Sequence, residues 1–385
     1  MPAFLPTDDL PMKKVVFLIE SFTLGGAEKV LTDIVREIDG ERFQVTVCAL
    51  FKESVYGGHY PYKMKLPFNG TIRFRYLFDN RSRWVSLLAN FCLSRFPAKV
   101  YEFFIRDRFD VAVAFYEGAP TRLLAAAKLK RGKKMAWLHT STELSQKGKT
   151  EEDLRREQAR YAKFDRIVAV SQFVADSFSG LFPELSGRIV TAYNPIDVEE
   201  IRRKAADSVP FSRGPEPLLV SVGRMTGAKA YDRYLRVVRD LKSRGFSFQV
   251  WIAGGGDRSE LEVFCRENGL DNVTFLGNQP NPYPLMKMAD WIILPSRTEG
   301  LPTVVLESLA LGKAVLATDC GGTREILGDS AYGLLVGNDE QSLTEGLSRV
   351  LSGQVDKRQY EAAALHRGSD FTLEARMPVI EEILK

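Results

Sequence analysis

Short apolar runs alternate with amphipathic stretches along most of the 385-residue chain. KVVFLI (Lys14 to Ile19) and DWIIL (Asp290 to Leu294) have the composition of buried parallel strands. Helical spacing of apolar residues follows the first of them at Val30, Leu31 and Ile34. Further strands or strand-to-helix units are expected at 43–50, 110–115, 133–139, 165–178, 217–244, 248–262, 272–286 and 313–327. The alternation predicts an α/β protein with doubly wound parallel sheets.

The length suits two domains, since 385 residues exceed one ordinary core. A charged stretch rich in proline and glycine at 196–216 is expected to be the linker. It would separate a Rossmann-like domain at 1–195 from a second one at 217–370, which a terminal helix at 371–385 follows. Charge is uneven, at +8 for residues 1–205 and −4 for the remainder. The basic half is therefore expected to face an anionic partner.

The segment 59–108 is the least typical part of the chain. It carries ten Lys and Arg, three acids and twelve aromatic residues. A basic amphipathic helix bordered by aromatics is typical of a membrane-surface segment, with Arg81, Arg83 and Arg95 as candidate contacts. The alternative is an ordinary helix that packs its apolar stripe on the sheet. Nucleic acid is disfavoured because no RNP, zinc-finger or helix-turn-helix signature is present.

The junction at 295–311 is the strongest candidate for a ligand site. A strand ends at Pro295, a polar loop carries Glu299, and a helix is expected from Pro302 through Glu307. Free N–H groups at such a helix start attract anions, and ionised carboxylates accept hydrogen bonds from hydroxyls. Glu299 and Glu307 are therefore expected to bracket a long polar guest, such as a diphosphate that carries a sugar hydroxyl at each end.

A second strand exit supplies cations. Gly223 and Arg224 follow one strand, and Lys229 comes five residues after Arg224. The planar guanidinium and the mobile ammonium suit a diphosphate leaving group, whose departing charge they would stabilise.

These motifs resemble those of the retaining glycosyltransferases of family 4, which have the two-domain GT-B fold. The resemblance rests on the E-x7-E spacing of Glu299 and Glu307, on GRMTGAKAYD at 223–232, and on GGAEKV at 25–30. Gly227 and Ala230 depart from the residues common in the second motif. The resemblance spreads over nearly the whole chain and is strongest from Leu218 to Gly328. It also implies that the helix at 371–385 crosses back to the N-terminal domain.

The resemblance also implies roles for single residues. Glu299 would hold the donor sugar and Glu307 the nucleotide ribose. The remaining donor-binding candidates are Gly25, Gly26, Gly223, Arg224, Lys229, Asn278, Gly300, Leu301, Pro302 and Thr303.

On the acceptor side, His139 stands at the exit of a strand and precedes a Ser/Thr run. A histidine there can donate to a sugar hydroxyl or an acceptor group, and family 4 enzymes often carry one. We therefore group it with Arg224, Lys229 and Glu299 as catalytic candidates. Glu117, after the preceding strand, is a further acceptor-side candidate, or else a charge at a helix N-terminus.

The expected function is transfer of a sugar from a nucleotide-sugar, with a UDP-sugar as the expected donor, to a lipid-linked saccharide in surface polysaccharide or glycoconjugate synthesis. The alternatives are a GT-B epimerase or phosphorylase, and a non-catalytic sugar-binding protein at a membrane surface. No metal and no cofactor besides the nucleotide-sugar are expected, because the chain has three histidines and no D-x-D strand end. Residues 1–14 contain no apolar run fit for a signal peptide, and no uncharged stretch is long enough to span a bilayer. We expect a cytoplasmic protein in peripheral contact with anionic membrane, and no nucleic-acid partner.

Overall fold

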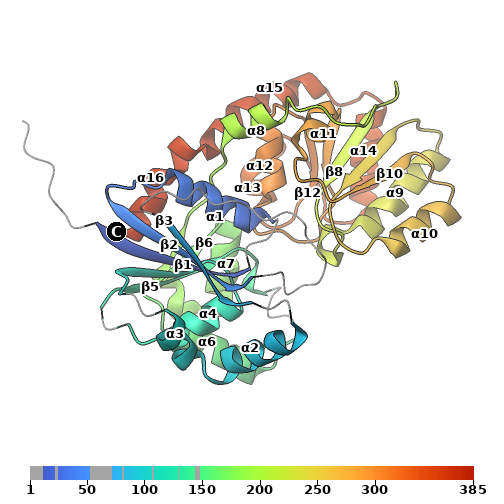
Figure 1. Cartoon of the computed structure of the whole chain (residues 1–385). Coiled ribbons are helices and arrows are strands. Elements are labelled where there is room, and N and C mark those ends of the chain that lie inside the picture. The colour runs from blue at the N-terminus through green and yellow to red at the C-terminus, as the bar shows by residue number, and fades with distance from the viewer. Residues whose placement is uncertain are drawn as a thin grey trace, which may run out of the picture.

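The computed structural model describes residues 12–21, 25–52, 72–79, 82–105, 108–129, 131–143 and 148–385. Two parallel sheets, each flanked by helices, form the two halves of the molecule (Figure 1). The expected α/β architecture with two doubly wound domains is therefore confirmed. Within the described ranges, no helix combines the length and apolar character needed to cross a bilayer.

The N-terminal sheet has seven strands in the order β3-β2-β1-β4-β5-β6-β7. Residues 15–19 of its central strand β1 are buried, which explains why that run is continuously apolar instead of alternating. The side chain of Ser171 caps α7 by accepting from the Val174 N–H at 3.2 Å. The elements are β1 (Lys13–Ser21), α1 (Gly26–Glu37), β2 (Phe43–Phe51), β3 (Ile72–Phe78), α2 (Arg83–Arg95), α3 (Pro97–Phe104), β4 (Val111–Ala114), α4 (Ala119–Ala126), β5 (Lys133–Leu138), α6 (Glu151–Tyr161), β6 (Arg166–Ala169), α7 (Gln172–Leu181), η1 (Pro183–Arg188), β7 (Ile189–Thr191) and α8 (Val198–Lys204).

The C-terminal sheet has six strands in the order β10-β9-β8-β11-β12-β13. Strand order reverses between β8 and β11, and ligand crevices form beyond the strand ends at such a point. The elements are β8 (Leu218–Val222), η2 (Gly227–Lys229), α9 (Tyr231–Ser243), β9 (Gln249–Ala253), α10 (Ser259–Glu267), β10 (Val273–Gly277), α11 (Tyr283–Met288), β11 (Trp291–Leu294), α12 (Thr303–Ala310), β12 (Val315–Thr318), α13 (Thr323–Leu327), β13 (Leu334–Val336), α14 (Glu340–Leu351), α15 (Lys357–Gly368), η3 (Ser369–Phe371) and α16 (Leu373–Leu384).

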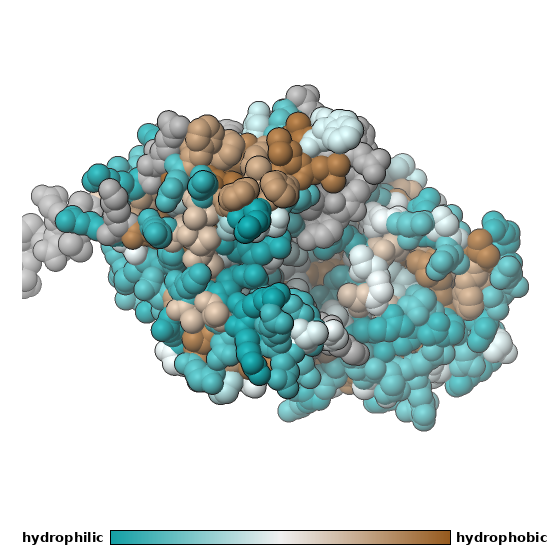
Figure 2. Space-filling view, turned by 90° about the horizontal axis from the view of Figure 1, so that it is seen from below, coloured by the Kyte–Doolittle hydropathy of each residue, from teal (hydrophilic) through white to brown (hydrophobic). Residues whose placement is uncertain are grey.

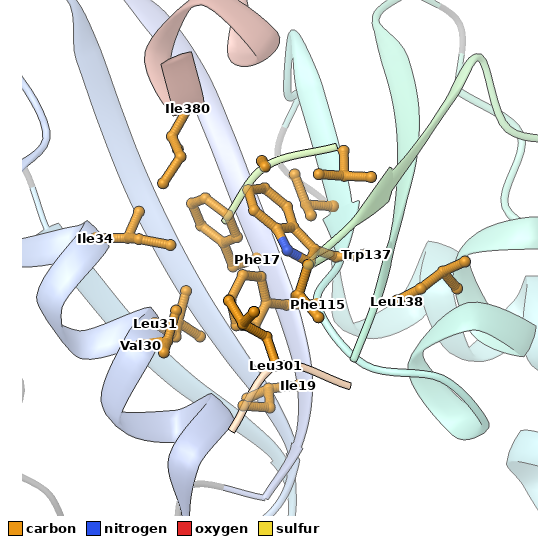
Figure 3. Close-up of a cluster of buried hydrophobic side chains, with 14 of the residues drawn as sticks. Phe17, Ile19, Val30, Leu31, Ile34, Phe115, Trp137, Leu138, Leu301 and Ile380 are labelled. Atoms are coloured by element: carbon orange, nitrogen blue, oxygen red, sulfur yellow. The ribbon is translucent and has the colours of Figure 1, made fainter. Parts of the chain in front are cut away.

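The last helix, α16, lies against α1 of the N-terminal domain (Figure 1). Glu381 on α16 accepts from the Asp39 N–H at 3.0 Å and from Arg42 Nη1 at 2.8 Å. Figure 3 shows Ile380 of α16 and Leu301 of the C-terminal domain pointing into the cluster around Phe17. One apolar cluster thus draws on segments from both ends of the chain.

Two segments carry more structure than the sequence suggested. The stretch expected as one basic amphipathic helix contains two helices, α2 and α3, which break at Phe96 because Pro97 begins the second helix. The range 196–216, expected as a linker, contains helix α8, which Asp197 caps by accepting from the Glu200 N–H at 2.8 Å.

Candidate active site

A cavity of about 1070 Å³ lies between the two domains. Its walls are the exits of parallel strands: β5 with His139, β8 with Gly223, and β11 with the loop to α12. The predicted donor-site and catalytic residues that line it are Gly25, Gly26, His139, Gly223, Arg224, Lys229, Asn278, Glu299, Gly300, Leu301, Pro302, Thr303 and Glu307. The structure therefore brings all of these residues to one cavity.

Glu299 joins the two strand exits of the C-terminal domain. Its Oε1 accepts from Lys229 Nζ at 2.6 Å and from Ser296 Oγ at 2.6 Å. The side chains of Lys229 and Glu299 are 23% and 11% exposed, so the pair is shielded but still reachable from the cavity. A cation and a carboxylate held in this way can bind a phosphate oxygen and a sugar hydroxyl side by side.

The helix α12 presents its N-terminus to the same cavity. Pro302 precedes the helix, and no described side chain accepts from its first N–H groups. Those groups and the helix dipole favour an anion there. The cavity thus combines a positive helix end with the two cations Arg224 and Lys229.

Glu307 lies farther along α12, where its side chain is 9% exposed. Its Oε1 accepts from the Tyr283 hydroxyl at 3.1 Å and lies 3.8 Å from Lys29 Nζ of the N-terminal domain. Burial raises the pKa of Glu307, and the charge of Lys29 opposes that rise.

His139 is stacked on Tyr116, with ring centroids 5.7 Å apart. Burial lowers the pKa of His139 to about 3, although a hydrogen bond to the Phe115 backbone has a weaker effect that raises it. The imidazole is therefore neutral at physiological pH, and its buried Nε2 has no partner among the described residues. A neutral imidazole can exchange a hydrogen bond with a ligand but supplies no positive charge.

Glu117 occupies a different place from the acceptor-side position suggested by the sequence. It is absent from the cavity wall, and its Oε1 accepts from the His139 N–H at 2.8 Å, the Thr140 N–H at 2.9 Å and Thr140 Oγ1 at 3.0 Å. Burial raises its pKa, although these hydrogen bonds favour the charged form. Its observed contacts hold the loop that carries His139.

The membrane candidates are covered only in part. Arg81 lies outside the described residues, and only the backbone of Arg83, the first residue of α2, is described. Arg95 ends α2, where it is exposed and its guanidinium lies 5.8 Å from the centre of the Phe96 ring.

Sequence reasoning missed four charged residues of α1. Lys29, Asp33 and Arg36 line the cavity, and Glu28 lies close enough to Arg224 for the positive charge of Arg224 to lower the Glu28 pKa. Burial raises the pKa of Glu28 to about 7, which the charge of Arg224 partly opposes. The four-residue spacing of Lys29 and Asp33 was a readable signal for a pair on one helix face. In the described part of the chain, no three His, Cys, Asp or Glu side chains gather closely enough to hold a metal ion.

Comparison with known proteins finds two family models that match the chain in succession. Glycosyltransferase Family 4 matches residues 24–200, and Glycosyl transferases group 1 matches residues 203–366. The chain belongs to the group 1, family 4-like glycosyltransferases. The family resemblance drawn from the sequence motifs is therefore confirmed.

Two curated relatives illustrate the likeness. A Campylobacter jejuni protein named N-acetylgalactosamine-N,N'-diacetylbacillosaminyl-diphospho-undecaprenol 4-alpha-N-acetylgalactosaminyltransferase is 31% identical over 215 residues, which are 55% of this chain and 57% of the relative. The alpha-D-kanosaminyltransferase of Streptomyces kanamyceticus is 26% identical over 185 residues, which are 46% of this chain and 48% of the relative. The chain spans about half the length of these curated relatives.

Solved structures match over almost the whole chain. HepE of Anabaena, in complex with UDP and glucose, has a TM-score of 0.71 and 18% identity, and the match covers 97% of this chain and 99% of HepE. At this identity the likeness shows the fold, which is the GT-B arrangement of two Rossmann-like domains.

Proposed function

We propose that the protein is a retaining glycosyltransferase that moves a sugar from a nucleotide-sugar, a UDP-sugar in the first instance, to a lipid-linked saccharide. The observation that carries the proposal is the convergence of Arg224, Lys229, Glu299 and Glu307 on one cavity between the domains. The binding of UDP and glucose by HepE, a protein of the same fold, supports the choice of donor. The diphospho-undecaprenol in the name of the Campylobacter relative supports the choice of acceptor.

The geometry suggests how the donor lies. The diphosphate rests at the start of α12 beside Arg224 and Lys229, the sugar reaches Glu299, and the ribose reaches Glu307. The distance along α12 from Pro302 to Glu307 is roughly 7 to 8 Å at 1.5 Å per residue. That span matches the part of a nucleotide-sugar between its diphosphate and its ribose.

The proposed reaction is front-face transfer. The bond between the sugar C1 and the diphosphate oxygen breaks, and a bond from C1 to the acceptor oxygen forms on the same face. The acceptor hydroxyl gives its proton to an oxygen of the departing diphosphate, so the nucleoside diphosphate leaves protonated. Arg224 and Lys229 stabilise the charge that develops on this leaving group.

Replacing Lys229 tests the role of the cations. We expect Lys229→Met to lower kcat on the order of 100-fold, while donor affinity falls less, because the missing charge matters most when the diphosphate departs. Lys287→Met, which removes an exposed lysine of the same domain, is the matched control. Unchanged turnover in Lys229→Met and in the parallel variant Arg224→Met would refute this role.

A panel of UDP- and GDP-sugars, assayed with and without saccharide acceptors, tests the reaction class. A transferase releases nucleoside diphosphate when acceptor is present and retains the donor's anomeric configuration, which NMR of the product reports. An epimerase or phosphorylase would convert the donor without an added acceptor or with phosphate alone. A non-catalytic sugar-binding protein would bind donor and release nothing.

The peripheral membrane contact is proposed from the surface of α2. Its exposed apolar residues Trp84, Leu87, Leu88 and Phe91 recur at the spacing of a single helical stripe, whereas Ala89 and Leu93 are buried. This stripe therefore faces outward instead of packing on the sheet. We propose that it inserts into the interface of an anionic membrane, on the cytoplasmic side.

Cations and further aromatics border the stripe. Lys99, on α3, lies with its Nζ 5.7 Å from the centre of the Phe96 ring, and Arg95 ends the preceding helix α2. Phe103, also on α3, is 62% exposed. Figure 2 shows hydrophobic side chains gathered into a brown area on the face of the molecule seen from below.

Sedimentation with vesicles tests the contact. We expect the triple variant Trp84→Ala, Leu88→Ala, Phe91→Ala to lose most of its binding to vesicles of phosphatidylglycerol and phosphatidylcholine at low salt. A control with Leu365→Ala and Val263→Ala removes exposed apolar side chains from the other domain. Equal binding by the triple variant, or no binding by the unaltered protein, would rule out the contact.

A further inference from the structure

An ion pair links the two domains inside the candidate donor site. Lys29, in the first turn of α1, lies with its Nζ 3.1 Å from Asp33 Oδ2 on the same helix and 3.8 Å from Glu307 Oε1 on α12. The side chain of Asp33 is 2% exposed and that of Lys29 is 19% exposed. The three groups form a row, Asp33, Lys29 and Glu307, that crosses from one domain to the other.

The contacts of Glu307 leave one of its oxygens for a ligand. Lys29 and the Tyr283 hydroxyl both approach Oε1, and no described residue pairs with Oε2. Because Glu307 lines the cavity, a ribose hydroxyl can donate to the remaining oxygen. The carboxylate is thus oriented by two groups and open on its other side.

A buried carboxylate binds two hydroxyls well only when it is ionised. Burial raises the pKa of Glu307, and Asp33 adds to that rise, whereas Lys29, the Tyr283 hydroxyl and Lys204 lower it. Lys29 itself keeps its charge: burial disfavours the ammonium, but Asp33, Glu307 and Glu200 outweigh burial and raise its pKa. Tyr283 stays protonated, since burial raises its pKa well above the usual range.

We propose that Lys29 is a positioning residue of the donor site. Lys29 holds Glu307 ionised and oriented toward the ribose hydroxyls, and Asp33 in turn holds Lys29 in place. Lys29 and Glu307 belong to different domains, so the proposed ribose site draws on residues of both. This inference rests on the proposed nucleotide-sugar transferase function.

The test compares UDP with 2',3'-dideoxy-UDP by calorimetry at pH 6, 7 and 8. The unaltered protein is expected to prefer UDP by 10-fold or more at each pH, since the dideoxy ligand leaves Oε2 of Glu307 without a hydroxyl partner. In Lys29→Met the preference should fall to about 3-fold or less and be weakest at the lowest pH, because the Glu307 pKa rises further once the charge of Lys29 is gone. Using the ratio of the two ligands removes the titration of the phosphate itself.

Two further variants separate positioning from folding. Lys29→Arg, which keeps the charge, is expected to restore most of the preference, and Glu307→Gln to remove it at every pH. An unchanged preference in Lys29→Met would overturn the inference alone. A failure of the unaltered protein to bind either UDP or GDP would overturn the proposed function, and this inference with it.

Discussion

At the scale of single residues, Gly300 marks a close backbone approach between the two domains. A Cβ placed on it would lie 1.9 Å from the carbonyl oxygen of His139, which is backbone and cannot turn aside. The Gly300 carbonyl in turn accepts from Ser171 Oγ at 3.0 Å and from the Gly322 N–H at 2.9 Å. The absent side chain is therefore what lets the donor loop rest against the strand exit that carries His139.

Gly300→Ala is expected to push this loop away from His139 and lower kcat/KM at least 10-fold, because a misplacement of about 1 Å in an active site costs on the order of 100-fold. Turnover and UDP affinity measure the effect. Gly227→Ala is the matched control, since a Cβ there meets nothing within 4 Å. Full activity in Gly300→Ala would show that the two loops need not touch.

At the scale of elements, α1 serves two partners at once. Its apolar residues Val30, Leu31 and Ile34 are buried against the N-terminal sheet (Figure 3). Its charged side faces the C-terminal domain through Lys29 and the segment between domains through Arg36. Arg36 pairs with Asp197 and, at 3.0 Å, with Glu200 of α8. The helix thus ties the sheet to the segment where the chain changes domain.

Arg36→Met is expected to lower the free energy of unfolding by about 1 to 2 kcal/mol at pH 7, between the values typical of exposed and of buried pairs. Burial alone would raise the pKa of the Glu200 carboxyl. Hydrogen bonds from Lys204 and Arg36 outweigh this effect of burial and lower the pKa of Glu200 to about 2. A depressed carboxyl pKa stabilises the fold above the unfolded value of about 4.5 and loses that effect as pH falls toward 2.

Urea unfolding at pH 7, 4.5 and 3 measures both effects. The difference between Arg36→Met and the unaltered protein should shrink below pH 4.5. Arg155→Met, which breaks a pair of side chains that are 77% and 87% exposed, should cost less than about 0.5 kcal/mol. A difference that grows on acidification would contradict the assignment.

At the scale of the whole molecule, the chain closes on itself. The C-terminal helix α16 follows the second domain in sequence but packs against the first, where Ile380 and Leu384 are fully buried. Leu301, 5% exposed, enters the same apolar cluster from the donor loop. The stability of the N-terminal domain therefore depends on residues more than two hundred positions away.

Ile380→Ala is expected to destabilise the protein by about 2 to 4 kcal/mol, because it leaves a cavity between α16, α1 and β1. Val379→Ala, at a position that is 43% exposed, is the neighbouring control and should change stability by less than about 0.5 kcal/mol. Chemical unfolding, with limited proteolysis to show which domain opens first, provides the measurement. Equal stability in the two variants would mean that α16 is not part of the core.

Periodicity and motif spacing were enough to predict the two parallel sheets, the cleft at the strand exits, and the set Arg224, Lys229, Glu299 and Glu307. These features depend on a strand, a loop and a helix that follow one another within about twenty residues, so neighbouring residues encode them. The same reasoning predicted an apolar stripe on α2, because helical spacing is local.

Which way that stripe faces, and what Glu117 and Lys29 contact, only the tertiary structure decided. Glu117 could equally have faced the cleft, and its place under the His139 loop follows from how β4 and β5 pair. Lys29 contacts Glu307 of the other domain, although the two residues are far apart in sequence. Such a contact depends on the packing of every element between them. The local sequence determined the elements and their strand exits, whereas the folded chain alone determined which charges share a buried space, because only packing sets distances between segments remote in sequence.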